Sequence, residues 1–111
     1  MVVETLPTAL TIDASAVGSV SLPNDSQYLY IGAGNDLTLV HNGTDSYFYN
    51  AAAGNLYIQN NVADKDVILR CDDGSGGDAA YITLDGSATQ TLLHQDTVLT
   101  ATKKLYFDTG G

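Results

Sequence analysis

The sequence predicts an all-β protein built of short antiparallel strands in hairpin-like repeats. Short runs rich in tyrosine, isoleucine, leucine and valine alternate with clusters of glycine, asparagine and aspartate, which is the pattern of strands joined by turns. The composition agrees, because seven tyrosines and 11 glycines suit strands and turns, and runs of strong helix formers are almost absent. With 111 residues, the chain is long enough for one domain with a modest core.

Residues 28–61 hold four expected strands and three expected turns. The strands are Tyr28–Ile31, Leu37–His41, Ser46–Tyr49 and Leu56–Gln59, and the turns between them are Gly32–Asn35, Asn42–Gly43 and Ala53–Asn55. Asn42–Gly43 is the strongest turn signal, because this pair tolerates the positive φ that a two-residue type I′ hairpin requires at both central positions. We therefore predict a positive φ at Asn42 and at Gly43.

An internal quasi-repeat extends this pattern along the chain. A tyrosine followed by an apolar residue recurs at Tyr30–Ile31, Tyr57–Ile58, Tyr81–Ile82 and Tyr106–Phe107, with spacings of 27, 24 and 25 residues. After each of the first three pairs comes a second apolar run, at 37–40, 67–69 and 92–93, and then a polar turn. The spacing is that of a strand-turn-strand unit, so we expect a hairpin repeated about three times, with a further one begun.

Both faces of the expected strands are apolar. Tyr28 and Tyr30 share one face while Leu29 and Ile31 share the other, because successive side chains of a strand point to opposite sides. A small sheet with one wet side would alternate apolar and polar residues instead. One short chain has too little material to cover both faces, so we predict a homo-oligomer. The expected interface residues are Tyr28, Leu29, Tyr30, Ile31, Tyr47, Phe48, Tyr49, Leu56, Tyr57 and Ile58.

Residues 1–27 differ in character from the rest, because they are rich in threonine, serine and small residues and contain no aromatic residue. Pro7 and Pro23 restrict the residues before them to extended conformations. Two interpretations stay open: an N-terminal arm that docks on another protein, and a first pair of strands of the same domain. We divide the chain into an attachment segment, 1–27, and a β-repeat body, 28–111.

The charge balance excludes several classes of partner. The chain has 13 acidic residues against four basic ones, for a net charge of −9, and 12 of the acids are aspartate, which favours turns. Duplex DNA and anionic lipid both need a cationic face, and the sequence has no 18-residue apolar stretch. We therefore expect neither nucleic acid nor a membrane as a partner, and we assign the acids to the solubility of an exposed surface.

Candidate binding residues have simpler interpretations. Asp72–Asp78 is rich in oxygen ligands but lacks the residue order and the glutamate of a calcium loop, so we interpret it as a turn. His41 and His94 could meet symmetry mates and bind a metal, yet a lone histidine at a strand end is more often packed or solvated. Tyrosines can stack on sugars, but their alternation within strands favours core or interface packing. We expect no metal site and no cofactor.

Catalytic motifs are missing from the sequence. Cys71 is the one cysteine, so a disulfide within the chain is impossible, and we expect a buried or half-buried thiol. No nucleophile elbow, zinc-protease motif, phosphate loop or paired-cysteine motif occurs. Carboxylate pairs, as in a glycosidase, could always be found among 12 aspartates and therefore decide nothing. We expect a protein that is not an enzyme, with no catalytic residues.

Several segments resemble a known family. The segment from Leu29 to Tyr47, LYIGAGNDLTLVHNGTDSY, is followed by NLYI at 55–58, by DKDVIL at 64–69 and by YITLDGS at 81–87. This series resembles the repeats in tail-fibre and other virion structural proteins of marine bacteriophages, cyanophages among them. The resemblance runs from about residue 28 to the end of the chain, where KLYFDTGG resembles the opening of a further repeat.

The resemblance implies a structural virion protein, a β-rich fibre or appendage segment assembled as a trimer about a threefold axis. Residues 1–27 would then be the segment that contacts other virion proteins. A capsid decoration protein is the alternative, and a tip that binds host surface glycans is a further one. Because the N-terminus lacks the basic flank and apolar core of a signal peptide, we expect synthesis in the host cytoplasm before assembly into the virion.

Overall fold

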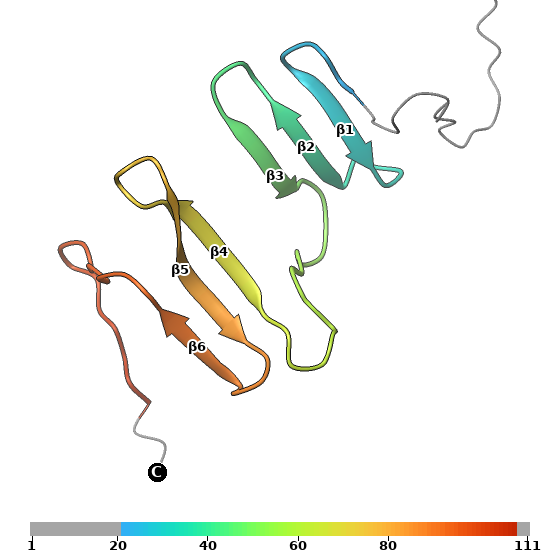
Figure 1. Cartoon of the computed structure of the whole chain (residues 1–111). Coiled ribbons are helices and arrows are strands. Elements are labelled where there is room, and N and C mark those ends of the chain that lie inside the picture. The colour runs from blue at the N-terminus through green and yellow to red at the C-terminus, as the bar shows by residue number, and fades with distance from the viewer. Residues whose placement is uncertain (1–20, 109–111) are drawn as a thin grey trace, which may run out of the picture. The chain divides into compact units, whose positions relative to one another are not determined.

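The computed structural model of the chain describes residues 21–108, and this part is all-β, as the sequence predicts (Figure 1). Its six strands are β1 (Gln27–Ile31), β2 (Leu37–His41), β3 (Ser46–Asn50), β4 (Val67–Asp72), β5 (Asp78–Asp85) and β6 (Gln90–Leu93). They form two separate three-stranded antiparallel sheets, and no helix occurs between residues 21 and 108. The chain divides between Leu56 and Tyr57 into two compact units, each of which holds one sheet.

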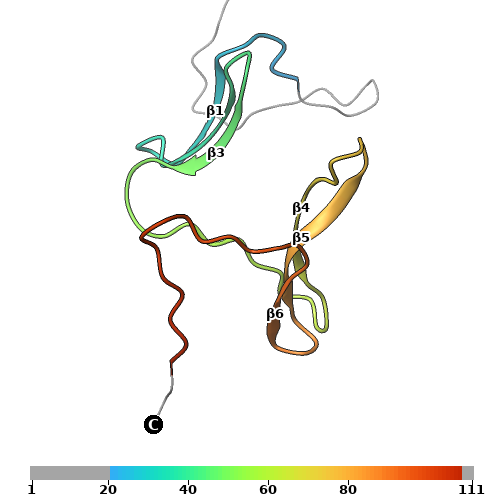
Figure 2. The same cartoon turned by 90° about the vertical axis from the view of Figure 1, so that its left-hand side faces the viewer.

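The first unit holds sheet 1, with the strand order β1-β2-β3. Its register places Leu29 opposite Leu39, and Leu39 opposite Phe48. The three strands predicted here are confirmed: β2 has the expected bounds, β1 begins one residue earlier, and β3 ends one residue later. Figures 1 and 2 show this sheet as a single layer, with no other described strand of its unit packed on either face.

The turn between β2 and β3 differs from the predicted two-residue hairpin. Gly43 has the expected positive φ of 95°, whereas Asn42 does not, and the connection runs over 42–45. The Asn42 side chain explains the difference: its Oδ1 accepts hydrogen bonds from the backbone N–H of Thr44 at 3.0 Å and of Asp45 at 2.9 Å. Side-chain capping of this kind lets asparagine form a longer turn at an ordinary φ, so the type I′ prediction is wrong.

The second unit holds sheet 2, with the strand order β4-β5-β6. The register shifts between Leu69 and Arg70, because Leu69 faces Ile82 while Arg70 faces Ala80. Tyr81 is thus the extra residue of a β-bulge in β5. On its other side, the carbonyl of Tyr81 accepts a hydrogen bond from His94 N–H at 3.0 Å, which extends the pairing with β6.

One predicted strand, Leu56–Gln59, does not form; the segment has no strand or bridge assignment. The hairpin expected from Tyr57 to Leu69 is therefore absent, whereas the first and third expected hairpins occur as β1–β2 and β5–β6. The side chain of Asn60 makes hydrogen bonds to the backbone just after this segment. Asn60 Nδ2 donates to the Asp66 carbonyl at 3.0 Å, and Asn60 Oδ1 accepts from Val62 N–H at 3.0 Å, so these bonds hold the turn that follows the segment. The last repeat pair, Tyr106–Phe107, likewise lies outside any strand.

Aspartates hold the turns of sheet 2, in agreement with the interpretation of the acidic composition. Asp73 Oδ1 accepts from Ser75 N–H and Gly77 N–H at 2.7 and 3.1 Å within the β4–β5 turn. Asp66 Oδ1 accepts from Gly86 N–H at 3.0 Å, which ties the segment before β4 to the β5–β6 turn. A Cβ at Gly86 would lie against the Lys65 carbonyl oxygen, so the two segments approach more closely than any larger residue permits.

Among residues 21–108, no apolar side chain is buried. The buried residues in this part are Thr38 and Thr83, at 1% and 6% exposure.

Residues 1–20 of the predicted attachment segment lie outside the described part of the chain. Residues 21–26 of this segment precede sheet 1 and Gln27 begins β1; Ser26 N–H donates to the His41 carbonyl at 2.8 Å and so extends the β1–β2 pairing by one bond. No helix in the described range is long and apolar enough to cross a membrane.

Candidate functional site

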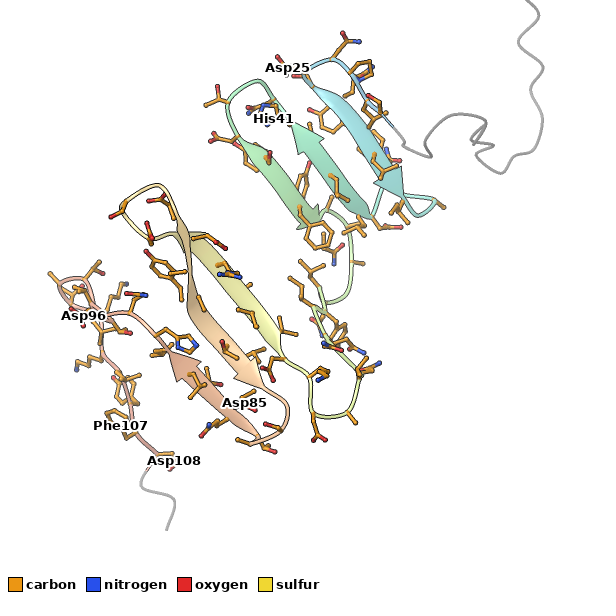
Figure 3. All side chains as sticks on the ribbon, in the orientation of Figure 1. Asp25, His41, Asp85, Asp96, Phe107 and Asp108 are labelled. Atoms are coloured by element: carbon orange, nitrogen blue, oxygen red, sulfur yellow. The ribbon has the colours of Figure 1, made fainter. Side chains whose placement is uncertain are left out.

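The two faces of sheet 1 are the most distinctive surfaces of the described chain (Figure 3). Because side chains alternate along each strand and the register aligns them across the sheet, each face has its own composition. The hydrocarbon face of sheet 1 consists of Leu29, Ile31, Leu37, Leu39 and Phe48. The threonine face of sheet 1 consists of Tyr28, Tyr30, Thr38, Val40, Tyr47 and Tyr49.

The threonine face is partly closed by its own tyrosines. Thr38 lies between Tyr30 and Tyr49 in the register and is 1% exposed. The rings of Tyr28 and Tyr30 stack with their centroids 5.2 Å apart, and the Tyr47 hydroxyl lies 3.4 Å from Asp45 Oδ2. A shallow groove of about 300 Å³ is lined by Tyr28, Val40, Asn42, Tyr47 and Tyr49.

The hydrocarbon face of sheet 1 is open, and its polar residues lie at its ends. At one end, His41 Nδ1 lies 3.0 Å from Ser46 Oγ, next to Gln27 in the register. Figure 3 shows Asp25 and His41 at this same end of the sheet. A second groove, of about 400 Å³, brings Leu22 together with Leu29 and Leu39. The segment just before β1 therefore borders this face.

Sheet 2 also has two aligned faces where its strands are regular, and both faces carry apolar residues. Val67, Leu84 and Thr91 are aligned across the sheet, and so are Leu69, Ile82 and Leu93, on one face; Ile68, Thr83 and Leu92 lie on the other. We call the first set, apart from Thr91, the hydrocarbon face of sheet 2. The central strands of the two sheets match: Leu37-Thr38-Leu39 in β2 and Ile82-Thr83-Leu84 in β5 each place a buried threonine between two apolar residues of the opposite face.

The predicted interface residues lie in two different parts of the first two-thirds of the chain: most are in sheet 1 and the rest follow it. Seven of them, Tyr28, Leu29, Tyr30, Ile31, Tyr47, Phe48 and Tyr49, lie in sheet 1 and are 41–50% exposed. The other three, Leu56, Tyr57 and Ile58, lie in the irregular segment after sheet 1, also exposed. Sequence reasoning missed the hydrocarbon face of sheet 2, although the apolar runs at 67–69 and 92–93 were a usable signal.

Charged residues are absent from the strands of sheet 1. In residues 21–56 the acids are Asp25, Asp36 and Asp45, all of which lie outside the strands, and this range contains no lysine or arginine. Sheet 2 contains an ion pair in which Arg70 Nε lies 2.7 Å from Asp78 Oδ2, with both side chains more than half exposed. An exposed pair of this kind contributes little to stability.

The candidate ligand residues are engaged within their own segments. Asp72 Oδ1 accepts from Gly74 N–H at 2.6 Å, so the loop that resembles a calcium site is a turn, as interpreted. His94 Nε2 lies 2.8 Å from Thr83 Oγ1. Within residues 21–108, no group of three or more histidine, cysteine, aspartate or glutamate side chains is placed to hold a metal ion. Cys71 is exposed in the single chain, so the predicted burial is wrong: it lies in β4, an edge strand of sheet 2.

One carboxyl in sheet 2 has a lowered pKa. Asp85 lies at the β5–β6 turn, where Figure 3 labels it. The hydrogen bond from Ala88 N–H, followed by that from the Ser87 hydroxyl, lowers the pKa of Asp85 below its ordinary value of 3.8. The cause is structural, because both donors belong to the turn that this carboxylate holds.

Comparisons with protein-family models, with curated proteins and with solved structures found no match to this chain.

Proposed function

We propose that this chain is a structural virion protein of a bacteriophage, a β-rich segment of a fibre or appendage that assembles from several copies. The observation that supports self-assembly is the missing apolar core: residues 21–108 bury no apolar side chain, while large apolar residues line both faces of sheet 1. Burial of such side chains is the main favourable term in folding, so each three-stranded layer needs a partner surface. Further copies of the same chain are the simplest source of it.

The virion assignment is supported by the resemblance of residues 28–111 to repeats of phage fibre proteins. Strands with open edges suit such a role, because neighbouring copies can cover or pair the edges that a free sheet leaves exposed. A threefold arrangement is our preferred form, since a closed symmetric assembly buries the same faces in every copy. Residues 1–27 would contact other virion proteins.

Purified particles of the phage that encodes the chain provide the test. We expect mass spectrometry to detect the chain in particles, and immunogold labelling to place it on a fibre or appendage. Labelling spread over the shell would instead support the alternative, a capsid decoration protein. Absence of the chain from purified particles would contradict the virion proposal.

A host-glycan receptor tip is a second candidate, favoured by the groove of about 300 Å³ that Tyr28, Tyr47 and Tyr49 line. Aromatic rings next to a polar amide such as Asn42 suit the apolar faces and hydroxyls of a sugar. A glycan array with the assembled protein tests this candidate. Binding that Tyr49→Ala abolishes would support it, and an array without any binding would count against it.

A further inference from the structure

The large side chains on the two faces of sheet 1 are similarly exposed, so exposure does not decide which face is covered in an assembly. In β3, Tyr47, Phe48 and Tyr49 are 45%, 47% and 41% exposed, although Phe48 lies on the hydrocarbon face and the tyrosines on the threonine face. The same holds in β1, where Tyr30 is 47% and Ile31 is 50% exposed. The chemistry of the side chains has to distinguish the faces.

The threonine face is suited to water. A tyrosine hydroxyl both donates and accepts hydrogen bonds, so an exposed tyrosine remains solvated at its tip. The tyrosines also shelter Thr38, which is 1% exposed without any other copy present. By contrast, Leu29, Leu39 and Phe48 carry no polar side-chain atom, and burial is the one favourable outcome for them.

Charge supports the same choice for a contact between copies. Each copy carries a net charge of −9, so two copies repel unless they meet through a surface without acids. The strands of sheet 1 contain no charged residue on either face, but the Asp45 carboxylate lies 3.4 Å from the hydroxyl of Tyr47, which belongs to the threonine face. The hydrocarbon face therefore lets two identical acidic chains come into contact without burying a carboxylate.

We propose that the hydrocarbon face of sheet 1 is the contact surface between copies of this chain and that the threonine face remains in contact with solvent. The proposal rests on the self-assembly proposed above and assigns to it one of two available faces.

The size of the face adds a requirement. Three strands about 4.8 Å apart and five residues long, at about 3.3 Å per residue, give a face of about 240 Å². A stable interface buries about 800 Å² of accessible surface on each partner, which is several times this flat footprint. This face alone is therefore too small. We infer that the hydrocarbon face of sheet 2 is also covered by other copies in the assembly.

Matched substitutions in β3 test the proposal. Phe48→Asp and Tyr49→Asp add the same charge to the same strand at similar exposure, but on opposite faces. We expect sedimentation equilibrium to show that Phe48→Asp raises the dissociation constant at least 100-fold, whereas Tyr49→Asp leaves the wild-type mass and less than a fivefold change. Ile31→Asp and Tyr30→Asp repeat the comparison in β1.

The outcomes separate this proposal from the one it rests on. A monomeric wild type would contradict the proposed self-assembly itself. An oligomeric wild type that Tyr49→Asp dissociates while Phe48→Asp does not, or that both dissociate equally, would overturn the choice of face. A shortened chain, 21–111, tests the other possible occupant: if it loses the oligomer and exposes this face, residues 1–20 cover the face rather than a second copy.

A measurement on the unmodified protein guards against variants that fail to fold. Tetranitromethane modifies exposed tyrosines, and peptide mass spectrometry locates each modified ring. We expect Tyr47 and Tyr49 in the assembled protein to react within a factor of about three of their rates in the urea-unfolded chain. Protection of both rings by more than tenfold in the oligomer would place the threonine face inside the assembly and overturn the proposal.

Discussion

Thr83 Oγ1 lies 2.8 Å from His94 Nε2, and this hydrogen bond joins the central strand of sheet 2 to the residue that follows β6. The corresponding residue of sheet 1, Thr38, is also buried. Its hydroxyl lies 3.5 Å from the Asn35 carbonyl oxygen, at the limit of a hydrogen bond. The two threonines thus share a position and differ in what their hydroxyls bind.

This difference predicts unequal costs for the same substitution. Thr83→Val removes a short, partly buried hydrogen bond to His94 and should lower the free energy of unfolding by about 1 kcal/mol. Thr38→Val keeps the branched shape and removes a weak bond, so we expect a change below about 0.5 kcal/mol. Urea denaturation of the two variants provides the comparison, and equal losses would contradict it.

The close approach of Gly86 to Lys65 predicts a steric effect. Gly86→Ala places a methyl group against the Lys65 carbonyl oxygen, which belongs to the backbone and cannot rotate away. We expect a loss of about 1–3 kcal/mol, the usual range for overpacking. Gly34→Ala is the control, because its nearest contact is the flexible Asp36 side chain. Thermal melting of both variants tests this, and a Gly86→Ala protein as stable as the control would refute the clash.

The β2–β3 turn predicts strain at one position and not at two. Gly43 has a φ of 95°, so Gly43→Val should cost about 1–2 kcal/mol, while Asn42 has no such requirement. Asn42→Asp keeps an acceptor for the N–H groups of Thr44 and Asp45, whereas Asn42→Ala removes it. We therefore expect Asn42→Asp to melt at a higher temperature than Asn42→Ala. A type I′ turn seen in an experimental structure would contradict this account.

The lowered pKa of Asp85 predicts an acid dependence of stability. A carboxyl whose folded pKa is depressed contributes stability that is present above its unfolded pKa, about 3.8, and is lost as the pH falls through the lower folded value. The difference in melting temperature between wild type and Asp85→Ala should thus be constant from pH 7 to about 5 and shrink below pH 4. Asp85→Asn retains an acceptor without titrating, which makes it the control. A difference that does not vary with pH would contradict the assignment.

The attachment segment predicts a separable function. Removing residues 1–27 should leave a soluble, folded oligomer that no longer incorporates into particles, because the hydrocarbon faces that we propose as the contacts between copies lie beyond it. Removing residues 1–20 is the milder variant, since it retains Ser26 and its hydrogen bond to His41. Co-expression with the remaining virion proteins measures incorporation. A shortened chain that aggregates would show that the segment belongs to the core.

The strands of sheet 1 were predictable because their signals are local. Apolar runs such as 37–41 are bounded by glycine and asparagine, and the structure places β2 at those residues. The segment 56–59 shows the same kind of run, yet it has no strand assignment, and side-chain hydrogen bonds of Asn50 and Asn60 hold the turns before and after it. Hydrophobic periodicity does not reveal such hydrogen bonds between side chains and the backbone.

The faces of β5 in sheet 2 were harder to predict from the sequence, for a different reason. The bulge at Tyr81 adds one residue to β5, so alternation counted from the start of the strand assigns side chains to the wrong side after it. In β1 and β3, where no bulge occurs, alternation predicted correctly which residues share a face. The sequence did not predict that residues 21–108 bury no apolar side chain, because burial depends on tertiary packing.

The central claim is that the fold is completed by other copies of the chain, and the mass of the folded protein in solution tests it most directly. Sedimentation equilibrium at neutral pH, with circular dichroism to confirm β structure, should give an oligomer, in our preferred form three times the chain mass of 11.7 kDa. A cooperatively folded species of 11.7 kDa at micromolar concentration would contradict the account.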